Sequence, residues 1–167
     1  MIITAANTIA QLEGIHIGIV LADARVIIPF LQVFDDKPNI SDKLLTKLAE
    51  WCIRFSPSVG IDLPDGLLLD ASGCPHLWGG ETIYLQTISA RLKKLGYNNR
   101  VVIADTIGCA WAISHFGESS FIIETGQQAT ALLSLSPAAL RVEDDVVERL
   151  KKLGLYTIKP LRMAFVL

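Results

Sequence analysis

The sequence predicts an α/β domain, with helices packed on a mixed β-sheet, followed by a smaller helical subdomain. Strand-like and helix-like segments alternate in the order β-β-α-β-α-β between residues 58 and 124. Strand signals stop after Thr125-Gly126, and only helix-like segments follow. The chain has 167 residues, which suffices for one domain with a core and a small appendage.

The apolar content of the chain indicates a buried core rather than a membrane-spanning segment. Hydrophobic residues make up 51% of the chain, and the mean hydropathy is +0.43. The longest apolar stretch, residues 15–31, is interrupted by His16, Asp23 and Arg25, and it falls short of a membrane span of about 18 uninterrupted apolar residues. We therefore expect strands buried on both faces or a surface that a partner covers, and no membrane partner.

Charge and cysteine usage bear on partners and compartment. The net charge of −2 argues mildly against a nucleic-acid binder. Three widely spaced cysteines without a Cys-x-x-Cys pair, and an N-terminus without signal-peptide features, favour a reduced cytoplasmic compartment. Two basic groups are either solvated helix ends or nucleic-acid contacts: Arg91, Lys93, Lys94 and Arg100, and then Arg149, Lys151, Lys152, Lys159 and Arg162.

The first 57 residues predict two short strands and two helices. The strands are expected at residues 2–5 and 31–34, and the first helix at residues 20–28, before Pro29. The second helix is expected to begin with Ser41 as its N-cap and to end near Ser56-Pro57. Its apolar residues recur at helical spacing and predict one buried face: Leu44, Leu45, Leu48, Trp51, Cys52 and Phe55.

Residues 58–124 carry the predicted sheet. Pro64-Asp65-Gly66 predicts the turn of a tight hairpin with strands at 58–63 and 67–71. A helix is expected over residues 81–95, ended by Gly96, and another after Asp105 or Thr106, through Phe116. Short strands are expected at residues 100–104 and 120–124. Asp70, near the end of the returning strand, is either a functional acid or a partner of a nearby loop amide.

The last segment predicts helices joined by a tight turn. Helices are expected at residues 127–135 and 143–153, the second with an inward face of Val146, Val147, Leu150 and Leu153. Residues 154–158 then predict a tight turn toward a further helix. Such a turn can present backbone N–H groups to a phosphate, or Gly154 can simply cap a helix that carries solvated lysines.

Four motifs in order carry a resemblance to a known family. They are Trp-Cys-Ile-Arg-Phe-Ser-Pro at 51–57, Pro-Asp-Gly-Leu-Leu-Leu-Asp-Ala-Ser-Gly-Cys-Pro-His-Leu-Trp-Gly-Gly-Glu at 64–81, Ile-Ala-Asp-Thr-Ile-Gly-Cys-Ala-Trp-Ala at 103–112, and Leu-Lys-Lys-Leu-Gly-Leu-Tyr-Thr-Ile at 150–158. Together they resemble the UmuC-type (Y-family) translesion DNA polymerases, most closely the ImuB branch of bacterial mutagenic repair. The resemblance extends over essentially the whole chain.

The resemblance implies a palm-and-fingers fold followed by a thumb. It implies a fingers-like segment at residues 1–40, a palm-like α/β core at 41–125, and a partial helical thumb with a helix-hairpin-helix-like turn at 126–167. The family's polymerases open with a strand that carries Asp-x-Asp, which has no counterpart in this sequence. The chain is therefore expected to be truncated at both ends.

The same resemblance implies degenerate site positions. Asp65 falls on a metal-ligand position of the family, and Gly66 falls on its neighbouring Glu. Thr8 and Gln11 stand where the family has a Tyr and an Arg that hold the nucleotide triphosphate, and Ile107 stands near a phosphate-binding Lys. Two-metal phosphoryl transfer needs several carboxylates, and Asp65 at the turn is otherwise explained as a turn residue. We therefore expect no catalytic residues, no metal and no cofactor, with Mg²⁺ only if the chain belongs to an active polymerase.

The functional expectation is a non-catalytic scaffold or adaptor in error-prone translesion synthesis and DNA repair, within the SOS response. One alternative is a fragment of an active Y-family polymerase, and another is a non-functional remnant or a protein-interaction module. By resemblance, the partners are damaged DNA, a sliding clamp, an ImuA-like protein and a replicative-type polymerase. Self-association is also possible, and the expected location is the cytoplasm, at the nucleoid. DNA contacts are expected at Lys151, Lys152, Gly154 and Lys159.

Overall fold

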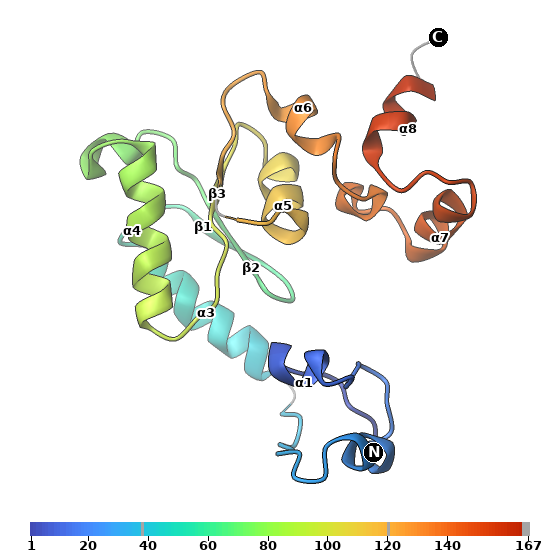
Figure 1. Cartoon of the computed structure of the whole chain (residues 1–167). Coiled ribbons are helices and arrows are strands. Elements are labelled where there is room, and N and C mark those ends of the chain that lie inside the picture. Colours follow the sequence, from blue (N-terminus) through green and yellow to red (C-terminus); the bar gives the residue numbers. More distant parts are fainter. Residues whose placement is uncertain (38, 120, 165–167) are drawn as a thin grey trace. The chain divides into compact units, whose positions relative to one another are not determined.

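The computed structural model describes residues 1–37, 39–119 and 121–164, and the chain divides into two compact units, Met1–Leu44 and Leu45–Leu167 (Figure 1). The two units are defined by the contacts among the residues within each of them. The domain boundaries at residues 40 and 125 that the family resemblance implies remain predictions.

The first unit contains helices α1 (Thr8–Leu12) and α2 (Leu21–Ile27). The Asn7 side chain caps α1 by accepting a hydrogen bond from the Ala10 amide at 2.9 Å. The helix predicted over residues 20–28 is confirmed as α2. The strand predicted at residues 2–5 is reduced to a single bridge between Ile2 and Val20.

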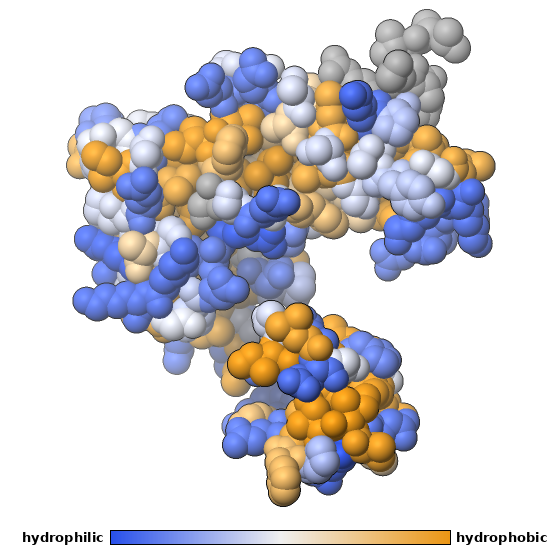
Figure 2. All heavy atoms as spheres, in the orientation of Figure 1, coloured by the Kyte–Doolittle hydropathy of each residue, from blue (hydrophilic) through white to orange (hydrophobic). Residues whose placement is uncertain are grey.

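The strand predicted at residues 31–34 is wrong, because these residues have irregular backbone. A strand needs a neighbouring strand for its N–H and C=O groups, and the local apolar pattern does not supply one. The first unit buries Ile15 and Ala24 but leaves several large apolar side chains at its surface (Figure 2). Five of them are at least 81% exposed: Met1, Leu12, Val26, Phe30 and Phe34.

Helix α3 (Ile40–Cys52) is the next element of the chain. Because Lys43 donates its amide to the Asn39 carbonyl at 3.2 Å, the first helical bond is accepted one position before Ile40. Ser41 therefore lies inside the first turn, and its prediction as the N-cap is wrong. Leu45, Cys52 and Phe55 on the predicted apolar face are buried.

The order β-β-α-β-α-β is confirmed between residues 58 and 124. The elements are β1 (Val59–Asp62), β2 (Gly66–Leu69), α4 (Glu81–Lys94), β3 (Val102–Ile103), α5 (Ile107–Phe116) and β4 (Phe121–Ile122), with a short 3₁₀ helix, η1 (Pro75–Trp78), before α4. Ser120, the expected first residue of the last strand, lies outside the described residues.

The strands form two hydrogen-bonded pairs. β1 and β2 are antiparallel, with Val59 opposite Leu69 and Asp62 opposite Gly66, whereas β3 and β4 are parallel. Across the described residues, no ladder joins the two pairs, so the expected mixed sheet is present as two separate parts. Residues of the hairpin and Ile103 of β3 nevertheless pack on one core, which contains Cys52, Phe55, Cys74, Tyr84 and Ile88.

Four helical elements complete the chain. They are α6 (Gln128–Leu132), the 3₁₀ helix η2 (Pro137–Leu140), α7 (Asp144–Lys152) and α8 (Ile158–Ala164). Helix α5 packs against β3, α6 and η2, and Ala112 of α5 shares a small core with Ala139 and Ile158. The predicted inward face of α7 is partly wrong, because Val147 is buried while Val146 and Leu153 are exposed.

Among the residues the structure describes, none of the helices has both the length and the apolar character that crossing a bilayer requires.

Candidate functional site

The tip of the β1–β2 hairpin carries two carboxylates. Residues 63–65 form the turn, and Gly66 is the first residue of β2, paired with Asp62. Gly66 therefore belongs to strand β2, and its prediction as part of the turn is wrong. The Asp65 side chain is 69% exposed, whereas that of Asp62 is only 20% exposed.

Asp65 meets a histidine from helix α5. The His115 Nε2 atom lies 3.3 Å from Oδ1 of Asp65, and the His115 Nδ1 atom lies 2.9 Å from the Trp111 carbonyl oxygen. The Ser114 Oγ atom lies 3.1 Å from the same Nδ1 atom, so the ring can donate to Asp65 from Nε2 and accept a hydrogen bond from Ser114 at Nδ1. The exposed position of Asp65 makes this a weak pair by itself.

Asp62 meets an arginine from the end of η2. Arg141 donates from Nη2 to Oδ2 of Asp62 at 2.8 Å. The Arg141 guanidinium carbon also lies 4.1 Å from the centre of the Trp111 ring, a cation–π distance. Trp111 in turn stacks on His115, with ring centroids 4.4 Å apart and planes inclined by 26°.

The fold explains how these side chains meet. Trp111 and His115 lie four residues apart on α5, so they occupy the same face of the helix. Arg141 is the residue that ends η2, in the left-handed conformation with φ 56°, and η2 is held against α5 by the contact of Ala139 with Ala112. We call Asp62, Asp65, Trp111, His115 and Arg141 the hairpin cluster.

The sequence analysis named Asp65 and Gly66 but missed His115 and Arg141 as their neighbours. His115 is separated from Asp65 by 50 residues, and Arg141 from Asp62 by 79 residues. No local pattern in the sequence marks either contact. Only the packing of α5 and η2 beside the hairpin brings them together.

Comparison with known proteins gives the relationship of the chain. It is 42% identical over 145 residues to the protein ImuB of Caulobacter vibrioides, in each of the strains NA1000 / CB15N and ATCC 19089 / CIP 103742 / CB 15. The matched region is 87% of this chain and 32% of each relative, so the chain spans about a third of the length of the curated relatives it matches. No protein-family model matches the chain.

The fold gives a second comparison. The structure resembles that of DinB from Sulfolobus solfataricus with a TM-score of 0.75 and 16% sequence identity, over 97% of this chain and 49% of that one. DinB is a Y-family polymerase. The chain is an ImuB-like protein with a Y-family polymerase-like fold.

The donor atoms of the ImuB-like chain do not fit the two-metal site that the polymerase fold implies. Oδ1 of Asp65 is in contact with His115, Oδ2 of Asp62 is bonded to Arg141, and position 66 has no side chain. Within residues 1–37, 39–119 and 121–164, no three His, Cys, Asp or Glu side chains lie close enough to hold a metal ion. Two adjacent cations need several shared carboxylates.

Asp70 has a structural partner. Its Oδ1 accepts a hydrogen bond from the Ser72 amide at 2.9 Å, and hydrogen bonding to Ser72 lowers the pKa of this carboxyl. The Asp70 carbonyl oxygen accepts a bond from the buried Ser56 hydroxyl at 2.7 Å. Of the two interpretations of Asp70, the contact with a nearby loop amide is therefore the one that the structure contains.

The remaining predicted nucleotide-site positions lie elsewhere. Thr8 and Gln11 are exposed on α1 in the first unit, where the Gln11 amide donates to the Ala6 carbonyl at 3.2 Å. Ile107 is the first residue of α5 and is 65% exposed, about two turns before His115. Whether these positions bind a nucleotide stays a prediction.

The predicted DNA-contacting turn of the ImuB-like chain uses its amides internally. The Gly154 amide donates to the Lys151 carbonyl, and the Leu155 amide to the Leu150 carbonyl, each at 2.9 Å, which is a Schellman cap with Gly154 at φ 78°. At the start of α8, the amides of Ile158 and Lys159 donate to Leu135 and Leu133. These four amides therefore already have partners within the chain.

The lysines near this turn differ in their surroundings. Lys151 donates to Oε1 of Glu148 at 2.8 Å, and this hydrogen bond raises the pKa of Lys151. Lys152 and Lys159 are exposed. The DNA contacts expected at these residues remain predictions, with Lys152 and Lys159 as the better candidates.

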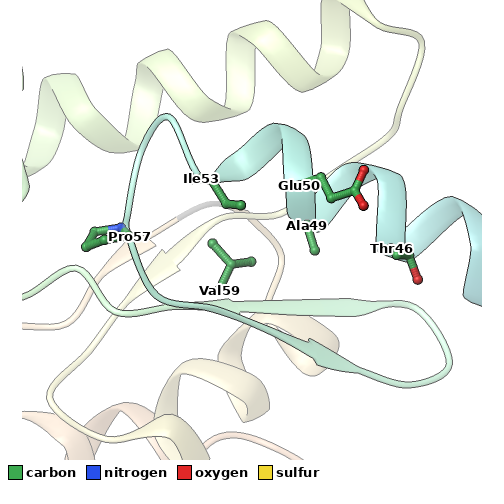
Figure 3. A pocket seen from close by; sticks show the side chains of 6 residues that line it. All are labelled: Thr46, Ala49, Glu50, Ile53, Pro57 and Val59. Carbon is green, nitrogen blue, oxygen red and sulfur yellow. The ribbon is translucent and has the colours of Figure 1, made fainter.

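A small groove lies away from all of these positions. It has a volume of about 230 Å³ and runs between α3 and the start of β1, where Ile53 and Val59 face each other (Figure 3). Its other lining residues are Thr46, Ala49, Glu50 and Pro57. The groove contains none of the predicted site residues and does not contribute to the hairpin cluster.

Proposed function

We propose that the chain is a non-catalytic, polymerase-like scaffold in error-prone translesion synthesis and repair of damaged DNA. The similarity to ImuB and the Y-family polymerase-like fold support a role connected with damaged DNA. The polymerase-like shape can organise other components around a DNA end without performing the transfer of a nucleotide.

The hairpin cluster is the observation that carries the non-catalytic part of the proposal. Nucleotide transfer needs carboxylates that are free to hold cations beside a triphosphate. In this chain an oxygen of Asp62 is bonded to the Arg141 guanidinium, and an oxygen of Asp65 is in contact with the His115 ring. Gly66 offers no third carboxylate beside them.

The partners of the scaffold follow from the same family relationship. We propose that DNA is contacted through Lys152 and Lys159, and that a replicative-type polymerase performs the synthesis. A sliding clamp and an ImuA-like protein are the further proposed partners. We propose that the whole protein binds these partners. The region that matches this chain is only 32% of each curated relative.

Primer extension tests the proposal directly. The 167-residue chain is incubated with a primer–template, all four nucleotides, and Mg²⁺ or Mn²⁺, with DinB from Sulfolobus solfataricus as the positive control. We expect no extension above a reaction without protein, together with measurable binding of the same DNA by fluorescence anisotropy. Extension by the chain that is lost in Asp65→Asn would overturn the proposal and support an active polymerase.

A further inference from the structure

The hairpin carboxylates are matched one to one by basic side chains from a later part of the chain. We infer that Arg141 and His115 form an internal clamp, which occupies the carboxylate oxygens that a divalent cation would need at the hairpin and fastens β1–β2 to α5 and η2. The inference deepens the proposed function and rests on it in treating Asp65 as a former metal-ligand position.

The stronger half of the clamp is the pair of Asp62 and Arg141. The Asp62 side chain is 20% exposed, and its contact with Arg141 measures 2.8 Å. Partial burial removes water that would otherwise screen the attraction. By contrast, Arg149 and Asp145 on α7 lie 3.3 Å apart with side chains 76% and 56% exposed, which is the setting in which ion pairs contribute little.

Trp111 joins the two halves of the clamp. Its ring lies under the Arg141 guanidinium at 4.1 Å and stacks on the His115 ring at 4.4 Å. The His115 Nδ1 atom lies beside the Trp111 carbonyl oxygen, and Nε2 on the other side of the ring lies beside Asp65. The two side chains are therefore held on one aromatic surface, opposite two carboxylates of one hairpin.

Gly66 makes room for this arrangement. A Cβ atom at position 66 would lie 3.0 Å from the Asp62 carbonyl oxygen and 3.4 Å from Asp62 Oδ2, the atom that Arg141 holds. A side chain at this position, a glutamate included, would crowd the carbonyl oxygen and the Cβ atom of Asp62, the latter at 3.3 Å. The glycine that removes a potential metal ligand thus also leaves space beside the residue that Arg141 holds.

The clamp has a consequence for cations in solution. A divalent cation shared by Asp62 and Asp65 would have to compete with Arg141 and His115 for the oxygens that they contact, and the Arg141 charge would repel it. Removing both basic side chains should leave two carboxylates unmatched and create weak affinity for Mn²⁺. Removing the Asp62 carboxylate or the Arg141 guanidinium alone should also weaken the attachment of the hairpin to α5.

A double-mutant cycle of Asp62→Asn and Arg141→Gln measures the coupling between these two side chains, with urea unfolding of the whole chain as the readout. We expect this coupling to change the folding equilibrium constant roughly fivefold. The matched cycle of Asp145→Asn and Arg149→Gln on α7 should give about twofold or less. Equal couplings in the two cycles would overturn the inference.

Mn²⁺ supplies a second readout, which is measured without unfolding the chain. Paramagnetic broadening of amide signals by Mn²⁺ should spare residues 61–66 in the wild-type chain and affect them in the double variant Arg141→Gln/His115→Gln. Broadening of these signals in the wild type that disappears in Asp65→Asn would overturn the clamp. Neither measurement depends on primer extension. The clamp can therefore be refuted while the proposed function stands, and the proposed function can be refuted while the clamp stands.

Discussion

The Asp62 carboxylate and the Arg141 guanidinium meet at 2.8 Å, and the same guanidinium lies over Trp111 of α5. One arginine therefore contacts the hairpin and helix α5 at the same time. The contact depends on the left-handed backbone of Arg141 at the end of η2, which turns the chain at that residue. The hairpin and the helical elements after residue 126 are linked through this side chain.

Replacing Gly66 with alanine should destabilise the chain, because the added Cβ meets the backbone oxygen of Asp62 at 3.0 Å. That oxygen belongs to the paired strand and cannot move without disturbing the ladder. We expect a loss of roughly 1 kcal/mol in the free energy of unfolding, measured by urea unfolding. Gly60→Ala in β1 is the control, since its Cβ would meet only the Leu68 Cβ at 3.9 Å. Equal losses in both variants would contradict the steric explanation.

Tyr84 should make the chain sensitive to alkaline pH. Its hydroxyl donates to the Phe55 carbonyl at 3.1 Å, and burial raises the pKa of Tyr84 to about 12. Between pH values of about 10 and 12, the unfolded chain loses this proton while the folded chain keeps it, so the free energy of unfolding falls as pH rises, by about 2 kcal/mol.

The variant Tyr84→Phe should remove that part of the alkaline decline. It should also cost roughly 1–2 kcal/mol at neutral pH, because the Phe55 carbonyl is left without its donor. Denaturant unfolding at a series of pH values measures both effects. Tyr156→Phe, at a residue that is 66% exposed, should change neither, and an alkaline decline that persists in Tyr84→Phe would refute the assignment.

Replacing Gly154 and Gly108 with alanine should change the stability of the chain in opposite directions. Gly154 caps α7 with φ 78°, a conformation that costs a residue with a Cβ about 1 kcal/mol. Gly108 lies within α5, and a Cβ there would have no atom within 4 Å. Gly108→Ala should therefore stabilise the chain by roughly 0.5–1 kcal/mol. Thermal unfolding of the two variants is the measurement, and a shift of the same sign in both would contradict the cap geometry.

Lys152 and Lys159 should account for part of any DNA affinity. The double variant Lys152→Ala/Lys159→Ala should bind a primer–template more weakly and reduce the salt slope of log Kd by about 2, one counterion for each lost phosphate contact. Anisotropy titrations at several salt concentrations measure this slope. Lys47→Ala/Lys94→Ala, which removes two exposed lysines from α3 and α4, is the control for the loss of charge alone. If both variants have the same slope, the turn has no special role.

The sequence by itself determined the order of the elements between residues 58 and 124, the hairpin with Asp65 at its tip, and the glycine cap at Gly96. These features follow from neighbours within a few residues: apolar spacing, turn residues and backbone conformations that favour glycine. The strand expected at residues 31–34 failed for the complementary reason, since a strand exists only where another segment pairs with it.

The tertiary structure alone decided the surroundings of the carboxylates. Asp62 and Asp65 face Arg141 and His115 because α5 and η2 pack together through Ala112 and Ala139, and no residue near the hairpin in sequence encodes that contact. The same structure shows that Gly66 has a spatial role beside Asp62, where the sequence indicated only a missing acid. Electrostatic partners are set by distance in space, and distances across 50 or 79 residues exist only once the helices have packed.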